Sequence, residues 1–307
     1  MNKLTKYGLT ALAGSLVATS VSAGELGVTG SWSWSYDSKD SDESGQPMSM
    51  GDSVTFAASG IETDQGWTAG VSYELDGGNF DDYKLTLDMG DGGNLTFGGG
   101  SVAGDGISLV SNIVPHADTA VYNMTDEGTD YGVADGASGT SNLGYNITVG
   151  DVKVAAEMQK GAGTSRGIGI TYTGVENLTL AYGQGDVNPG QVNGGNDERV
   201  MGIKYAVAGA TLAYMKTKVD VGGSGGADED ATHMGVSFAV NDDLTVSYGV
   251  QEVDITGKGE DEKNSGFGIS YTMGSMSVAA YAGKTTDGNG VSTADDEGKG
   301  ITLSIAF

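Results

Sequence analysis

Carboxylates are the reactive groups that this sequence concentrates most clearly. The interval from residue 100 to residue 141 carries six acidic residues and neither lysine nor arginine: Asp105, Asp118, Asp126, Glu127, Asp130 and Asp135. Carboxylate oxygens attract cations and can bind Ca²⁺, but no acidic cluster in the chain has the spacing of an EF-hand loop. No cofactor is therefore expected: the acids are interpreted as simply solvating the loops, and weak Ca²⁺ binding in the loops is the alternative.

Other catalytic chemistry finds little support in the sequence. The chain has no cysteine, and its two histidines, His116 and His233, have no partner at zinc-ligand spacing. Neither a Gly-x-Ser-x-Gly elbow nor a phosphate-binding loop is present. Acidic residues outnumber basic ones 41 to 15, which disfavours a nucleic-acid partner. The sequence thus predicts a protein that is not an enzyme.

A short pattern recurs at a fixed interval of 33 residues. It indicates the secondary structure that positions the acidic residues. It begins at Gly169, Gly202, Gly235 and Gly268, and each copy continues with Ile or Val, one polar residue, and Tyr or Phe. A second alternating run comes after each copy within a few residues. One repeat is therefore two strands, a tight turn and a long loop, which is typical of a transmembrane β-barrel.

Alternation of period two predicts sixteen strands. Their expected ranges are 26–36, 52–61, 66–75, 83–89, 94–99, 142–149, 152–160, 166–173, 178–183, 200–207, 211–219, 232–240, 244–254, 265–273, 277–284 and 299–307. An even number of strands of this length suits a tilted antiparallel barrel in a membrane.

Only one face of each predicted strand is apolar. In the strand at 265–273 that face carries Phe267, Ile269 and Tyr271, while Gly268 and Ser270 lie on the other. A secreted sandwich would alternate in the same way. The small, uncharged polar face suits a water-filled lumen, and an open sheet would leave unpaired edges in lipid, so a closed barrel is favoured.

Both ends of the chain carry export signals. Residues 1–23 combine Lys3 and Lys6 with a short apolar run and small residues before a cut after Ala23, which predicts a cleaved signal peptide and a mature barrel of residues 24–307. At the C-terminus Ile301, Leu303, Ile305 and Phe307 alternate and end on an aromatic residue. This terminus resembles the signal by which bacterial outer-membrane barrels are recognised for assembly.

The complete mature chain resembles the general porins of Gram-negative bacteria, which have sixteen strands. The resemblance rests on the strand count, the terminal pattern and the position of the 100–141 interval after the fifth strand. In that family the third external loop folds into the lumen. The resemblance further implies homotrimers in the outer membrane and passive diffusion of ions and small hydrophilic solutes.

The resemblance also gives the acidic interval a role, because the family's constriction sets loop acids against a basic cluster on the wall. Strand parity places Lys84, Lys153, Lys204, Glu74, Asp88 and Glu157 on the lumen face. Few basic residues face the lumen, because Arg166 and Arg199 have the parity of the apolar face and lie near strand ends. The sequence therefore predicts a cation-preferring pore whose loop carboxylates set selectivity. The alternative is a plugged structural or adhesive barrel whose loops bind a partner.

Overall fold

The computed structural model describes residues 25–39, 47–99, 106–110, 113–114, 142–160, 164–187, 195–222 and 227–307. These residues form sixteen strands: β1 (Glu25–Lys39), β2 (Met48–Glu62), β3 (Thr68–Asp76), β4 (Asn79–Asp88), β5 (Asn94–Gly99), β6 (Asn142–Val149), β7 (Val152–Lys160), β8 (Thr164–Val175), β9 (Leu178–Val187), β10 (Asn196–Val207), β11 (Ala210–Val221), β12 (Glu229–Ala239), β13 (Leu244–Ile255), β14 (Glu262–Met273), β15 (Met276–Thr286) and β16 (Asp296–Ala306). Three short 3₁₀ turns accompany them: η1 (Gly90–Gly92), η2 (Gly106–Leu109) and η3 (Gly288–Gly290).

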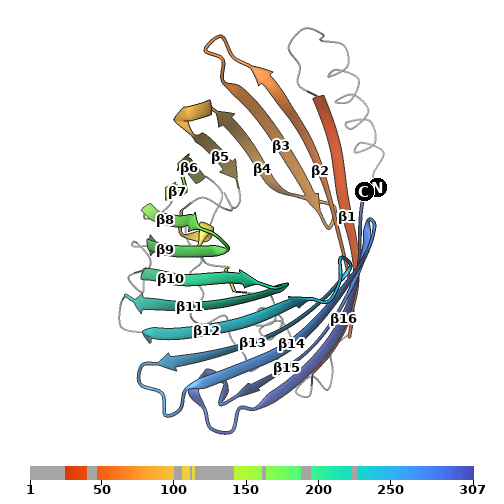
Figure 1. Cartoon of the computed structure of the whole chain (residues 1–307), viewed down its shortest axis with the longest axis vertical. Helices are drawn as coiled ribbons and strands as arrows, with labels where there is room; N and C mark the ends of the chain where they lie inside the picture. The colour runs from red at the N-terminus through yellow and green to blue at the C-terminus, as the bar shows by residue number, and fades with distance from the viewer. Residues whose placement is uncertain are drawn as a thin grey trace.

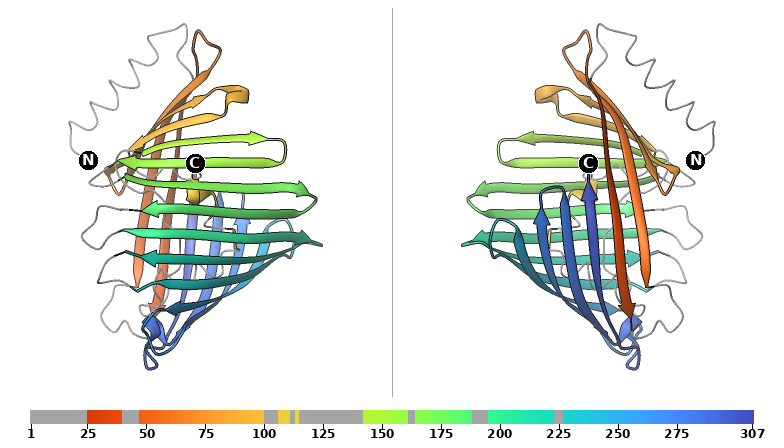
Figure 2. Two further views of the ribbon diagram at one scale, coloured as in Figure 1. Left: turned by 90° about the vertical axis from the view of Figure 1, so that its left-hand side faces the viewer. Right: turned by 90° about the vertical axis from the view of Figure 1, so that its right-hand side faces the viewer.

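Every strand pairs antiparallel with its neighbours in sequence, and β1 pairs with β16 to close the barrel (Figures 1 and 2). The seam is held at the turn end by Gly30 and Phe307, whose backbones exchange N–H···O bonds of 2.8 and 2.9 Å. A closed sheet has no edge strand, so its backbone groups are paired without water. The predicted antiparallel barrel of sixteen strands is therefore confirmed.

The outer face of the barrel is apolar and open to its surroundings. Phe267, Ile269 and Tyr271 on β14 have exposed fractions of 49%, 38% and 42%. Registered neighbours continue this surface, since Tyr248 of β13 lies opposite Phe267 and Val278 of β15 opposite Tyr271. In water such a surface would be a severe aggregation hazard, whereas hydrocarbon solvates it.

The two ends of the barrel differ in the length of their connections. One end has tight turns, such as those between β6 and β7 and between β14 and β15, which use Gly150 and Gly274 at φ values of +58° and +62°. These values are natural for glycine and suit the twist of a two-residue hairpin. The other end carries the longer connections, except for the Gly77–Gly78 turn between β3 and β4. We call these two ends the turn end and the loop end.

Several strands extend further toward the loop end than the sequence pattern predicted. β10 begins at Asn196 rather than Val200, and β14 begins at Glu262 rather than Ser265. The first residues of these strands are polar or charged on both faces, so they lack the apolar alternation that revealed the rest. Register with β9 and β13 nevertheless continues through them.

Among the described residues, no helix has the length and apolar character needed to cross a membrane.

Candidate functional site

The lumen of the barrel contains a segment of the connection between β5 and β6. Residues 106–110 and 113–114 lie against the inner wall, and Figure 1 shows η2 (yellow) beside β8 and β9. Four of their side chains are buried in one cluster with inward-facing wall residues. The cluster consists of Ile107, Val110, Ile113, Val114, Ala181, Val200, Ala213 and Met215. Apolar burial thus holds this segment inside the barrel, on the arc from β9 to β11.

Glycines on the inner wall make room for this segment. A Cβ at Gly169 would lie 2.1 Å from the carbonyl oxygen of Gly106, and one at Gly202 would lie 2.1 Å from Cδ1 of Ile113. Gly169 and Gly202 are two of the glycines that begin the 33-residue repeats. Their inward position explains why these two lack a side chain: the segment occupies the space.

Glu157 of β7 anchors the segment by a polar contact. Its Oε1 accepts a hydrogen bond of 3.0 Å from the backbone N–H of Ile107, and the carboxylate is 5% exposed. Gly106 precedes this contact with φ of +70°, and a Cβ there would meet Glu157 Cγ at 2.2 Å. Glu157 therefore lies on the inner face, as its parity predicted, but it lies beneath the segment and not in open lumen.

An open cavity of about 530 Å³ lies between the segment and the opposite arc of the wall. Ile113 and Val114 form one side of it, and Lys204 of β10 lies on its border. The rest of the lining is rich in small hydroxyl side chains from β11 to β14: Thr211, Ser237, Thr245, Ser247 and Ser270. Such groups hydrogen-bond water without fixing a charge, which suits the wall of an aqueous passage.

The remaining predicted wall residues also lie on the inner side of the sheet. Glu74 of β3 accepts a hydrogen bond from Ser53 Oγ, and Ser72 lies opposite Lys84 of β4. Lys84 is 3.6 Å from a carboxylate oxygen of Asp82, so part of its charge is balanced locally. The other two predicted wall residues are Asp88, which lies opposite Asn94 of β5, and Lys153, which lies opposite Thr171 of β8. Their part in selectivity stays a prediction.

Some predicted residues lie outside the described part of the chain. They are the loop acids Asp105, Asp118, Asp126, Glu127, Asp130 and Asp135, together with His116 and the signal peptide. Arg166 and Arg199 are described, and both are exposed on the outer face of the barrel. The terminal residues Ile301, Leu303 and Ile305 point outward on β16, where Leu303 lies opposite Trp34 of β1.

Sequence reasoning missed a polar network on the inner wall near the loop end. Asn264 Nδ2 donates to Gln251 Oε1 and to Glu262 Oε1, both at 2.7 Å, and Thr285 Oγ1 donates to Asn264 Oδ1 at 2.6 Å. Glu262 also accepts a 2.8 Å bond from the backbone N–H of Asn289 next to η3. These residues share the inner parity, but the contacts join three strands and a loop, which periodicity along one strand does not reveal.

Within the residues that the structure describes, no three His, Cys, Asp or Glu side chains gather in a group able to hold a metal ion.

A closed sheet with an apolar outer surface and a hydroxyl-lined interior defines a transmembrane β-barrel. The Gram-negative porin family model matches residues 8–292, and the chain belongs to that family. It is accordingly a β-barrel of the bacterial outer membrane.

Solved structures share the fold at low sequence identity. OmpT of Vibrio cholerae, in a variant that lacks loop L8, is 17% identical with a TM-score of 0.71, covering 93% of this chain and 100% of that one. The trimer form of OmpT is 13% identical with a TM-score of 0.66, covering 93% and 100%. A mutant of the Rh. blastica porin is 14% identical with a TM-score of 0.67, covering 92% and 100%. No curated protein shows significant similarity to the chain.

Proposed function

We propose that the protein is a water-filled, non-enzymatic channel for passive diffusion of ions and small hydrophilic solutes. The observation that carries this proposal is the cavity of about 530 Å³ between the 113–114 segment and the hydroxyl-rich wall. It provides a polar path beside the segment, and no step of the transport requires a cofactor. The complete 100–141 interval is proposed to form the constriction, with the segment as its fixed part.

The channel is further proposed to prefer cations. Once Lys3 and Lys6 are removed with the signal peptide, 13 basic residues remain against 41 acidic ones. The lumen-facing lysines are few, and Lys84 is already beside Asp82. The loop acids of residues 105–135 add negative charge at the proposed constriction. A narrow passage with this balance raises the local concentration of cations.

Conductance across a planar bilayer tests both statements. Full-length mature protein purified in detergent should insert in open steps, and the reversal potential in a salt gradient should have the sign for cation selectivity. Open steps with anion selectivity would keep the channel and overturn the charge argument. A folded barrel without conductance would contradict the channel and favour the plugged, partner-binding alternative.

The plugged alternative has one observation in its favour. The inner wall near the loop end is covered on the arc from β12 to β14, where His233, Val253 and Glu262 are each at most 1% exposed. The conductance experiment decides whether a passage remains beside these buried residues.

A homotrimer is proposed to form through the outer face of β1 to β5. Apolar side chains reach the loop end on this arc, where Met48, Met50 and Phe80 have exposed fractions of 59%, 67% and 76%. On β11 the corresponding outward positions carry Lys216 and Lys218. A large exposed apolar surface beyond the lipid belt is typical of a subunit contact. Met50→Lys should then convert trimers to monomers in light scattering, and an unchanged mass would contradict this interface.

A further inference from the structure

A shallow lipid-facing groove lies on the outer surface of β10 to β13. It has a volume of about 520 Å³ and an almost wholly apolar lining. Ile203 and Tyr205 of β10, Leu212 and Tyr214 of β11, Met234 of β12 and Tyr248 of β13 line it. All six side chains are exposed. In a membrane this shallow hollow is filled by hydrocarbon, which packs against its apolar side chains.

Two cationic side chains lie on the same outer face at the loop end of this groove. Lys216 comes two residues after Tyr214, so it has the same parity and lies one step closer to the loops. Arg199 has the outward parity of Ile203 on the neighbouring strand, where it lies opposite Lys218. Lys216 is therefore diagonal to Arg199, a spacing across which long side chains reach one another. The arrangement places both cations at the border between the apolar belt and water.

Within the described part of the chain, neither cation has an ion-pair partner, although Asp197 lies on the same outer face two residues from Arg199. Within the described residues, the side chains of Arg199 and Lys216 make no hydrogen bond and no ion pair. Two other outward basic residues have acidic partners: Arg166 is 3.6 Å from Asp186, and Lys284 is 3.6 Å from Glu297. Lys218, which lies opposite Arg199, is instead paired with Asp220 on its own strand.

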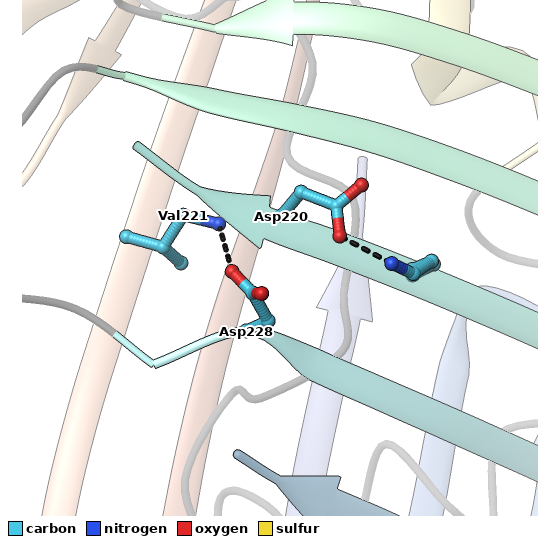
Figure 3. A network of polar contacts seen from close by, with 4 residues as sticks. Asp220, Val221 and Asp228 are labelled. Carbon is cyan, nitrogen blue, oxygen red and sulfur yellow. Dashed lines mark hydrogen bonds and ion pairs between the residues drawn. The ribbon is translucent and has the colours of Figure 1, made fainter. Parts of the chain in front are cut away.

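Two nearby carboxylates, Asp220 and Asp228, are engaged further toward the loops, and Asp197 and Asp230 also lie on this outer face, where Asp230 is opposite Lys218. Asp220 pairs with Lys218, and Asp228 accepts a 2.9 Å bond from the backbone N–H of Val221, as Figure 3 shows. These contacts take place beyond Lys216 on β11, away from the groove. The side of Lys216 and Arg199 that faces the membrane is thus left without a counter-charge from Asp220 and Asp228.

We propose that this surface binds one lipid of the leaflet at the loop end whose phosphate-containing headgroup has a net negative charge. An acyl chain lies in the groove, and the headgroup phosphate contacts Arg199 and Lys216. A guanidinium matches two phosphate oxygens at once, and a lysine reaches up from the belt to the headgroup level with its aliphatic stem in the apolar layer. Both requirements, an apolar chain and an anionic head, are met together by an anionic membrane lipid.

Native mass spectrometry of the full-length mature protein tests the proposal. The protein is released from detergent after incubation with phosphatidylglycerol or with phosphatidylcholine of the same acyl chains. One phosphatidylglycerol per subunit should be retained, and the double variant Arg199→Gln/Lys216→Gln should reduce its retention by about fivefold or more. Met234→Trp, which fills the groove and leaves both charges, should reduce it as well.

Two controls keep the result specific. Lys284→Gln/Lys299→Gln removes the same charge from outward positions on β15 and β16, away from the groove, and should retain the lipid. The exchange Arg199→Lys/Lys216→Arg keeps both charges and should bind as the unaltered protein does. Circular dichroism and resistance to trypsin establish that each variant is folded before its binding is compared.

Several results would overturn the lipid site. Retention unchanged by Arg199→Gln/Lys216→Gln, or equal retention of the two lipids, would show ordinary lipid around a barrel. Equal loss in Lys284→Gln/Lys299→Gln would show a general effect of charge. Displacement of the lipid by inorganic phosphate in the millimolar range would show a phosphate site in which the groove has no part.

Discussion

The carboxylate of Glu157 on β7 accepts the backbone N–H of Ile107 across 3.0 Å, and both residues are buried inside the barrel. Fifty positions separate them in the sequence. The bond fixes the start of the inward segment at one place on the wall, and the apolar cluster around Ile107 and Val110 holds the rest of the segment. A charge-assisted bond in a site poor in water is among the stronger single contacts available to this fold.

Glu157→Ala should release the segment. The N–H of Ile107 would be left without this acceptor in a buried place, at a cost of about 1–3 kcal/mol to the packed conformation. We expect larger current fluctuations in single-channel recordings of Glu157→Ala. Glu157→Gln retains an acceptor oxygen and should behave more like the unaltered protein. Recordings of Glu157→Ala that match those of Glu157→Gln would show that the contact does not hold the segment.

Gly169→Ala should displace the segment into the lumen and lower the single-channel conductance. Its new Cβ would meet a backbone carbonyl oxygen, that of Gly106, at 2.1 Å. Gly268 occupies the same place in its repeat, but a Cβ there meets only the rotatable Ser247 Oγ at 2.8 Å. Gly268→Ala is the matched control and should conduct normally. Equal conductance in both variants would contradict the position of the segment.

Lys204→Glu should strengthen cation preference. The side chain borders the lumen cavity, so the substitution changes the charge near a passing ion by two units. A change of about two- to fivefold in the cation-to-anion permeability ratio is expected at moderate salt, decreasing as salt increases. Lys299→Glu makes the same change on the outer face and should leave the reversal potential where it was. If Lys299→Glu changed the reversal potential by a similar amount, the effect of Lys204→Glu could not be attributed to its position beside the lumen.

Phe307→Ala should lower the yield of assembled protein in cells more than it lowers the stability of refolded protein. The backbone bonds between residue 307 and Gly30 persist without the ring, and the Phe307 ring is 67% exposed. The expected loss of unfolding free energy after refolding in detergent is about 1 kcal/mol or less. Phe267→Ala removes an exposed phenylalanine outside the terminal pattern and should assemble normally. Normal assembly of Phe307→Ala would contradict the terminal signal.

Local periodicity predicted most of the fold because the barrel is built from repeated local units. Alternation along β14 separates Phe267 and Ile269 from Gly268 and Ser270, and register with β13 and β15 preserves that division around the wall. The strand ends were predicted less well. Asn196 to Arg199 are polar on both faces, so pairing with β9 and β11, and not an apolar alternation, identifies them as strand residues.

The candidate site was predictable in part only. Strand parity correctly predicted that Lys204 lies on the inner face, because parity can be read along a single strand. The covering of Glu157 by Ile107 depends on contact between a loop and a distant strand, for which a single sequence contains no periodic signal.

The bonds between Gly30 and Phe307 place the beginning and the end of the ordered sheet side by side. A short linker between these two ends would make the chain circular. The circular chain could then be cut at another turn, and every strand would keep the same neighbours in the sheet. Circular permutants with new termini in the turn at Gly150 or at Gly274 would thus have the same closed sheet. In the finished barrel each strand pairs with its neighbours in sequence, and the pairing of β1 with β16 gives the first and last strands two partners as well.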